Sequence, residues 1–195
     1  MSAQLKIAVI LSSTRQARLA DKPAQWFLDF ARAEHPEITF ELVDLRDFNL
    51  PFFDEVASNA WAPSQSPEAV KWQQKIAEFD GYIFVTAEYN HSITGALKNA
   101  LDQAYVEWAK KPMGAVGYGG LGAGRAIEHL RAIAVELQMV PVRNAVHIGG
   151  GDFMAISPLG ANGEMSEIAG HIEGSAKGLL ADIAWWGAAT KAARG

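Results

Sequence analysis

The sequence predicts a doubly wound α/β fold, in which a parallel sheet of five strands carries helices on both faces. Short apolar runs alternate along the chain with longer segments of helical periodicity. Uninterrupted apolar runs are typical of parallel strands, because such strands are buried on both faces. Right-handed crossovers between the strands then place helices on the two faces of the sheet. We expect the 195 residues to form a single domain.

The first strand is expected at Lys6–Leu11, where the sequence reads KIAVIL. Helical spacing follows over Leu19–Glu34, and His35-Pro36 ends this helix. A second strand is expected over Ile38–Val43. The segment 46–66 then shows no periodicity and is longer than most loops in a compact domain. Ordered loops of this length often carry function, so this segment is a candidate for part of the site.

The rest of the chain continues the alternation. Helices are expected at Pro67–Phe79, Gly95–Val106 and Gly122–Gln138, and strands at Tyr82–Ala87, Pro112–Tyr118 and Val140–Ile148. The glycines at 149–151 end the last strand, and an Ala-rich helix is expected at about 164–193. In doubly wound sheets, ligands bind beyond the carboxyl ends of the strands where the strand order reverses. The loops after the first, third and fourth strands are therefore the candidate site.

The composition excludes several classes of protein. The chain has no cysteine, which rules out disulfides, thiolate metal sites, iron–sulfur clusters and a cysteine nucleophile. Seventeen basic and 22 acidic residues give a net charge of -5 without a basic stripe, so nucleic acid is not an expected partner. No apolar run approaches the roughly 20 residues that span a bilayer, and the amino terminus lacks a signal-peptide pattern. We expect a cytoplasmic protein without membrane contact, whose redox chemistry would need a cofactor.

The loop after the first strand is suited to binding an anion. Residues 12–18 read SSTRQAR and run into the first helix. Unsatisfied N–H groups at a helix start, hydroxyl donors and planar guanidinium groups all favour phosphate oxygens. The alternative is that a serine or threonine caps the helix, but capping explains one hydroxyl and neither of the two arginines. The loop therefore predicts a phosphate site.

The loop after the third strand carries a more specific signal. Residues 86–102 read TAEYNHSITGALKNALD. This segment resembles the P-E-Y-N-x-S-x-P/T-x-x-L-K-N-x-x-D signature of the NADPH-dependent FMN reductase family, and residues 12–18 resemble that family's G-S-x-R phosphate loop. The resemblance covers about residues 5–150 and departs from the pattern at Ser12, usually glycine, and at Ala87, usually proline. From the residues alone, the segment is a polar turn with local hydrogen bonds.

The resemblance implies a flavodoxin-like fold with strand order 2-1-3-4-5 and non-covalently bound FMN. It implies that the first loop holds the FMN phosphate and that the second wraps the isoalloxazine ring. It also implies a homodimer or a dimer of dimers, in which the second subunit closes part of the flavin pocket. The predicted cofactor-binding residues of these two loops are Ser13, Thr14, Arg15, Arg18, Ala87, Glu88, Tyr89, Asn90, His91 and Ser92.

The loop after the fourth strand, GYGGLG at 117–122, formally matches the G-x-G-x-x-G dinucleotide motif. The motif follows the fourth strand and not the first, and no acidic residue ends the next strand to hold a ribose hydroxyl, so we discount this interpretation. Glycines can instead let backbone approach a flat ring, and the matching family loop contacts the pyrimidine side of the flavin. We therefore add Tyr118, Gly119 and Gly120 to the predicted flavin site. The alternative is a flexible turn before a tight helix start.

Together, these features predict an NAD(P)H-dependent FMN reductase. A hydride would pass from NADPH or NADH to FMN and on to a small acceptor such as free flavin, a quinone, an azo compound or a metal oxyanion. The flavin N5 atom is the reactive centre, so no catalytic side chain is predicted, and no metal site is predicted because His91 lacks spaced partners. Phe52, Phe53 and Trp61 are candidates either for a subunit interface or for burial beneath their own loop. The alternative function is a flavodoxin-like electron carrier without NAD(P)H turnover, although its T/S-x-T-G-x-T loop is missing.

Overall fold

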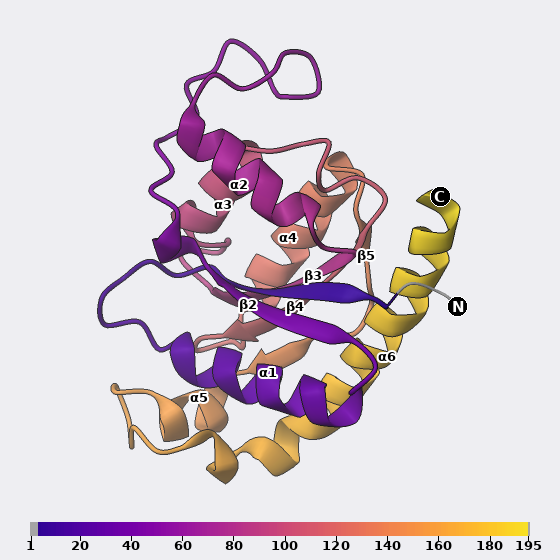
Figure 1. Cartoon of the computed structure of the whole chain (residues 1–195). Helices are drawn as coiled ribbons and strands as arrows, with labels where there is room; N and C mark the ends of the chain where they lie inside the picture. Colours follow the sequence, from indigo (N-terminus) through magenta and orange to yellow (C-terminus); the bar gives the residue numbers. More distant parts are fainter. Residues whose placement is uncertain (1–3, 195) are drawn as a thin grey trace.

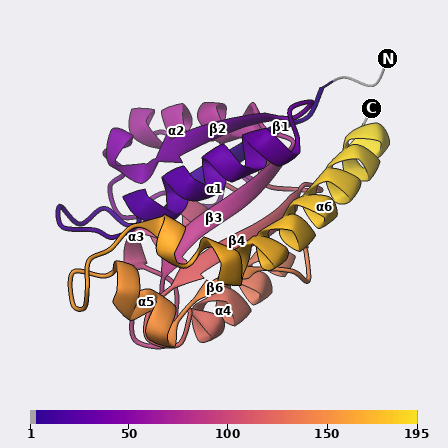
Figure 2. The same ribbon diagram turned by 90° about the horizontal axis from the view of Figure 1, so that it is seen from below.

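A computed structural model describes residues 4–194 and contains one parallel sheet. The strands follow the order β2-β1-β3-β4-β5, and β6 also pairs with β4 (Figures 1 and 2). The four long strands are β1 Lys6–Leu11, β2 Thr39–Asp44, β3 Gly81–Ala87 and β4 Pro112–Tyr118. The predicted doubly wound order is confirmed. β1 lies at the centre of the reversal, between β2 and β3, as the binding-site prediction requires.

Helices cover both faces of the sheet (Figures 1 and 2). One face is covered by α1 Asp21–Glu34, α5 Gly150–Ile156 and α6 Ala169–Arg194, and the other by α2 Pro67–Ala77, α3 Gly95–Asp102 and α4 Gly124–Glu136. Successive side chains of β1 point to opposite faces, so Ile7 and Val9 join the core under α1 and α6 while Ala8 and Ile10 join the other. Because both faces of the strand are buried, the five residues after Lys6 in KIAVIL are all apolar and do not alternate with polar residues.

The fifth strand position is filled by two short strands, where the sequence predicted one strand over 140–148. They are β5 Val140–Pro141 and β6 Val146–Ile148, and both pair with β4. The break falls at Asn144, whose side-chain amide donates hydrogen bonds to Asp182 (2.8 Å) and to the carbonyl of Gly178 (3.4 Å), both in α6. Because these bonds draw the chain toward α6, the ladder with β4 is interrupted.

Two helices have a boundary that differs from the prediction by more than two residues, and a third helix was not predicted. The helix α3 ends at Asp102 and not at Val106, and the final helix begins at Ala169 after a short 3₁₀ turn, η2 Met165–Glu167. The helix α5 begins directly at the glycines that the sequence predicted only as a strand end. Within residues 4–194, no helix is long and apolar enough to cross a membrane.

The long loop after β2 is tied to α3. After the short turn η1 Leu45–Asp47, residues 48–66 contain no helix or strand. Asn99 donates to the carbonyl of Pro51 (2.8 Å) and accepts from the N–H of Phe53 (3.1 Å), and Gln103 also donates to Pro51 (2.7 Å). Asn99, a residue of the 86–102 motif that lies on α3, therefore fixes the loop that follows β2.

Lys111 is a buried cation at the opposite, amino-terminal edge of the sheet. Its Nζ lies 3.0 Å from the Tyr82 hydroxyl and 3.4 Å from the carbonyl of Ala77, at the end of α2. Desolvation by burial lowers the pKa of Lys111 to about 8, and the nearby Arg194 charge acts in the same direction. The folded protein therefore disfavours the charged form of this lysine.

We expect the free energy of unfolding to rise with pH between about 8 and 10. In this window the unfolded lysine, with its ordinary pKa of 10.5, binds more protons than the folded one. Above this window the rise in the free energy of unfolding is opposed by Tyr82. Burial raises the pKa of its phenol, so the folded protein then binds more protons at this group than the unfolded chain does. In the variant Lys111→Met, the free energy of unfolding should no longer rise over this pH window, as measured by urea unfolding at several pH values. The control is Lys110→Met, at an exposed neighbouring position. If the free energy of unfolding of Lys111→Met rises with pH as it does in the parent, another group causes the rise.

Candidate functional site

The three predicted loops meet at the carboxyl ends of β1, β3 and β4, where they enclose a cavity of about 420 Å³. Cavities of this size are typical of small-molecule sites. The predicted residues that line it are Ser13, Arg15, Arg18, Ala87, Glu88, Tyr89, Tyr118, Gly119 and Gly120. The structure therefore brings together residues from loops more than 100 positions apart in the sequence.

Four predicted residues lie outside this lining. Asn90 and His91 occupy the tip of a tight turn, with φ of 49° and 76°, that is closed by two backbone hydrogen bonds between Tyr89 and Ser92 (2.9 and 3.1 Å). This left-handed pair of conformations is typical of two-residue hairpin turns and suits asparagine. The Ser92 hydroxyl lies 3.0 Å from a ring nitrogen of His129 on α4, so it ties the turn to that helix.

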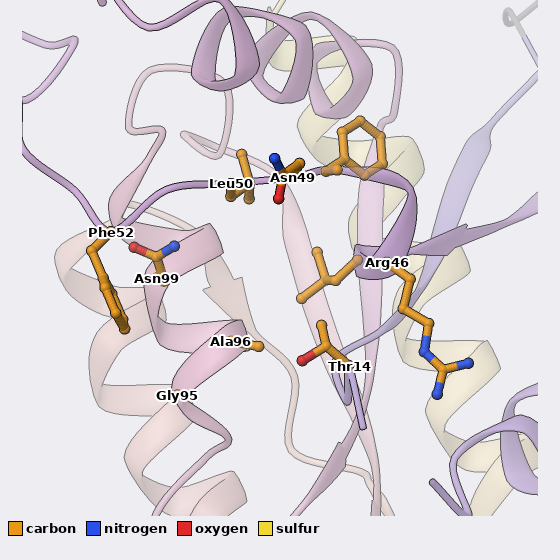
Figure 3. Close-up of a pocket in the computed structure, with 10 residues that line it drawn as sticks. Thr14, Arg46, Asn49, Leu50, Phe52, Gly95, Ala96 and Asn99 are labelled. Carbon is orange, nitrogen blue, oxygen red and sulfur yellow. The ribbon is translucent and has the colours of Figure 1, made fainter. Parts of the chain in front are cut away.

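The fourth residue, Thr14, lines a second cavity of about 580 Å³ (Figure 3). Its walls come from the first loop, the 45–52 segment and the start of α3. In Figure 3 the guanidinium of Arg46 extends away from Phe52 and Asn99. The two cavities thus share the 13–15 stretch as a common wall.

The outer wall of the first cavity was not predicted from the sequence. It is formed by Phe153, Ser157, Pro158 and Leu159, from α5 and the turn that follows it. Lys22 of α1 holds this segment in place, since its Nζ donates to the carbonyls of residues 156 (3.3 Å) and 163 (2.9 Å). No motif marks these residues, because their position depends on a helix that the sequence did not predict.

Arg18 is an internal anchor of the first loop. Its Nε and Nη2 donate to Asp21 (2.9 and 2.5 Å), its Nη1 and Nη2 donate to Asp44 (2.7 and 2.5 Å), and Nη1 also donates to the carbonyl of Ser13 (2.9 Å). These bonds engage all five N–H donors of the guanidinium, and its side chain is only 4% exposed. Hydrogen bonds to Asp44 and Asp21 raise the pKa of Arg18 above its ordinary value. The sequence predicted Arg18 as a phosphate ligand, but its donors are directed to the protein's own carboxylates.

The backbone N–H groups of the same loop, unlike the donors of Arg18, have no partner within the described residues. Arg46 of η1 donates to the carbonyls of Arg15 and of Gln16 (3.2 Å), and Arg15 donates to the carbonyl of Ala17 (3.1 Å). The backbone N–H groups of residues 13–19 donate no hydrogen bond to any other group of residues 4–194. The guanidinium of Arg15 lies 5.9 Å from the centre of the Tyr89 ring. The loop therefore offers a row of N–H donors and one exposed cation, which together suit an anion.

Ser12 stands where the resembling family usually has glycine, and it needs no left-handed backbone here, since it is not among the positive-φ residues of the described chain. Its buried hydroxyl donates to the carbonyl of Val85 (2.7 Å), and its own carbonyl accepts from the hydroxyl of Thr94 (3.0 Å). Ser12 therefore links the first loop to β3 and to the start of α3.

Glu88 connects the second and third loops. Its carboxylate accepts hydrogen bonds from Arg125 Nε (2.6 Å), from the N–H of Arg125 (3.1 Å) and from the N–H of Ala126 (3.4 Å). The helix α4 has no side-chain cap of its own at Ala123, so Glu88 supplies the cap from another loop. Burial raises the pKa of Glu88, but the hydrogen bonds from Arg125 and Ala126 outweigh this effect and hold the pKa below its ordinary value.

Glu88→Gln is expected to lower the free energy of unfolding at neutral pH by roughly 1 kcal/mol, because the charged cap and ion pair are lost. The sign of the pH effect follows from the lowered pKa. The stabilisation is complete above the ordinary value of 4.5 and is lost as the pH falls below it. Urea unfolding at neutral and acid pH should therefore show a smaller difference between variant and parent in acid. Glu128→Gln, on the exposed side of α4, is the control, and a difference that stays constant with pH would contradict the assignment.

The glycines of the third loop serve two purposes. A Cβ on Gly117 would lie 2.7 Å from the Cβ of Ala123, and one on Gly149, which precedes α5 and packs against the loop, would lie 2.5 Å from the nitrogen of Gly122, so close packing requires glycine at both positions. A Cβ on Gly120 would meet no atom within 4 Å. Gly120 therefore presents bare backbone to the cavity, where a flat ligand can approach closely.

Tyr118 ends β4 and lines the cavity while it is 5% exposed. Burial raises its pKa, the nearby Tyr89 adds to the rise, and a hydrogen bond with Ser13 opposes it. The phenol therefore stays neutral at ordinary pH and can donate a hydrogen bond within the site.

Sequence comparison identifies relatives of the chain. The family model described as NADPH-dependent FMN reductase matches residues 5–152. An NAD(P)H-dependent FMN reductase from a Nectria species is 32% identical over 185 residues, which cover 90% of this chain and 92% of the relative. A 2-hydroxy-1,4-benzoquinone reductase from a Burkholderia species is 33% identical over 144 residues, 70% of this chain and 73% of the relative.

Structure comparison supports the fold. The flavoenzyme FerB from Paracoccus denitrificans, an NAD(P)H:(acceptor) oxidoreductase, superposes with a TM-score of 0.68 over 92% of this chain and 97% of its own, at 22% identity. At this level of identity the similarity concerns the architecture alone. The flavodoxin-like fold class predicted from the sequence is confirmed.

Proposed function

Because the chain belongs to the family of NADPH-dependent FMN reductases, we propose that the cavity at the carboxyl edge of its sheet is the FMN site. Family membership makes the chain an NAD(P)H-dependent flavin oxidoreductase, as its sequence predicted. The observation that carries the assignment to this cavity is the row of unengaged N–H groups at 13–19. A flavin mononucleotide combines an anionic phosphate with a flat ring, and the cavity offers a matching surface for each.

The phosphate is assigned to the first loop. The N–H groups of residues 13–19, the hydroxyl of Ser13 and the guanidinium of Arg15 are the donors available to it, while Thr14 lines the second cavity. Successive backbone N–H groups of a loop can together bind an anion, and Arg15 adds a full positive charge. Arg18 contributes through the order of the loop and not through direct contact, because its five donors are engaged.

The ring is assigned to the space between the second and third loops. Ala87, Glu88 and Tyr89 form one wall, and Tyr118, Gly119 and Gly120 form the other. When bound, FMN supplies the hydride chemistry at its N5 atom. The protein's part is to hold the ring in a fixed orientation and to exclude water. Backbone N–H groups of the glycine loop would stabilise negative charge on the pyrimidine side. The turn of Asn90, His91 and Ser92 borders this wall and would shape the entrance for the electron donor and acceptor.

We assign quinones as the acceptor class with the best support. Among the relatives, those from Burkholderia, Arabidopsis thaliana and Solanum tuberosum are named as quinone reductases. A quinone is flat, so it can stack on the exposed face of a ring that lies on Gly120. Both NADPH and NADH remain in the proposal as electron donors, and we place the enzyme in the cytoplasm.

A homodimer is also proposed. The 48–66 loop exposes large apolar side chains, since Phe52, which lines the second cavity, and Trp61 are each 86% exposed. Monomeric proteins rarely expose several large aromatic side chains on one segment, and a second copy would cover them. Phe53 is 38% exposed and would lie at the edge of this contact.

Retention of flavin tests the cavity assignment. The purified protein is mixed with FMN, excess flavin is removed by gel filtration, and the absorbance of the protein fraction is recorded. Retained FMN in the parent and its loss in Arg15→Ala are the expected results. Retention that Arg15→Ala leaves unchanged would contradict the assignment of the phosphate to the first loop.

A further inference from the structure

Asp44 lies at the end of the edge strand β2, outside the first loop, but its carboxylate binds the arginines that contact this loop. Its two carboxylate oxygens accept from Arg18 Nη1 (2.7 Å) and Nη2 (2.5 Å), and Oδ1 also accepts from the N–H of Arg46 (3.0 Å). This carboxylate thus holds the guanidinium of Arg18 directly, and it caps the backbone of the turn that carries Arg46. Its side chain is 21% exposed, so these bonds are partly shielded from water.

The two arginines in turn hold the carbonyl groups of the loop. Arg18 donates to the carbonyl of Ser13, and Arg46 donates to those of Arg15 and Gln16. A trans peptide unit is planar, with its C=O and the following N–H pointing in opposite directions. Each carbonyl that a guanidinium fixes therefore turns the next N–H away from that guanidinium. The N–H groups fixed in this way are those of Thr14, Gln16 and Ala17.

We propose that Asp44 is a positioning residue for the flavin phosphate, acting through Arg18 and Arg46 to present the N–H groups of the 13–19 loop to the anion. This inference rests on the proposed function, since it concerns the same phosphate site. It gives a negative side chain a favourable role beside a negatively charged ligand. Asp44 can take this role because Arg18 and Arg46 balance the charges of Asp44 and Asp21, which leaves the charge of Arg15 to attract the anion.

A direct contact between Arg18 and the phosphate would predict the opposite effect of removing Asp44 on FMN affinity. If Arg18 contacted the phosphate directly, Asp44 would compete for the same guanidinium, and its removal would strengthen FMN binding. If Asp44 positions the loop, its removal weakens FMN binding, even though the variant loses a negative charge. The sign of the change in affinity therefore separates the two roles.

The test is the affinity of the flavin-free full chain for FMN and for riboflavin, measured by quenching of flavin fluorescence. Riboflavin lacks the phosphate, so the ratio of the two dissociation constants reports the phosphate site and is insensitive to a general loss of folded protein. Asp44→Asn is expected to weaken FMN binding by roughly tenfold to a hundredfold, with riboflavin binding unchanged. Asp47→Asn is the matched control, because this exposed carboxylate of the same turn makes no hydrogen bond within residues 4–194.

Asp21→Asn provides a second variant in case Asp44→Asn folds poorly. Its carboxylate is 58% exposed and contacts Arg18 alone, so a smaller loss in the same direction is expected. Tighter FMN binding in Asp44→Asn, or an FMN-to-riboflavin ratio unchanged in both variants, would overturn the inference while leaving the proposed function intact. A parent protein that binds FMN no better than riboflavin would overturn the phosphate site itself, and the inference with it.

Discussion

Replacing Gly120 with valine is expected to abolish FMN retention while the protein stays folded. The glycine presents backbone to the cavity, and a Cβ added there would meet no protein atom within 4 Å, so we expect the change to cost little in the empty protein. A flat ring placed against this backbone would collide with the valine methyl groups. We expect affinity for FMN to fall by at least about a hundredfold, which corresponds to roughly 3 kcal/mol. Gel filtration followed by an absorbance spectrum measures the loss.

Gly124→Ala is the matched control for Gly120→Val. Gly124 begins α4, also has no atom within 4 Å of an added Cβ, and does not line the cavity. This variant should retain FMN as the parent does. A Gly120→Val protein that keeps its flavin would show that the ring lies elsewhere, and the assignment of the third loop would then be incorrect.

Trp72→Ala is expected to destabilise the protein by about 3–5 kcal/mol, the cost of removing a large buried aromatic side chain. Trp72 is fully buried on α2, its Nε1 donates to the carbonyl of Ala100 (2.8 Å), and its ring packs edge-on against Phe48 and Trp108. It therefore supports both α3 and the start of the 48–66 loop. Urea denaturation followed by circular dichroism measures the change.

The control for this prediction is Trp185→Ala, which removes a side chain that is 64% exposed on α6. Its unfolding free energy should stay within about 1 kcal/mol of the parent value. A loss below about 1 kcal/mol in Trp72→Ala would mean that the aromatic cluster under α2 does not support the fold as described.

The strands and their order could be predicted because each depends on a local signal. KIAVIL and the runs over 82–87 and 112–118 are apolar without alternation, and the structure places all three at the centre of the sheet. The broken fifth strand could not be predicted, because the break depends on a hydrogen bond from Asn144 to Asp182, which is 38 residues away. The glycines before α5 were interpreted as a strand end, since nothing in their local sequence indicates a helix.

The same distinction applies to the site. Three loops were located from their position after buried strands, and all three line one cavity. Which side chains of these loops face the cavity depends on ion pairs with residues that are distant in the sequence. Arg18 is directed inward by Asp44, and Glu88 is directed to α4 by Arg125, so neither side chain is available to a ligand in the way that its motif position suggests. Residue type and spacing therefore indicated where the site lies, while long-range ion pairs decided which atoms face the cavity.

Anaerobic reduction of the FMN-loaded protein by NADPH tests the central claim most directly. The absorbance of the bound flavin is followed after NADPH is added, and a quinone is then added to the same sample. Bleaching on NADPH and recovery of the oxidised spectrum on quinone are the expected results for a flavin-dependent reductase. Flavin that stays bound and oxidised in the presence of both NADPH and NADH would contradict the claim and would favour an electron carrier that receives its electrons from another protein.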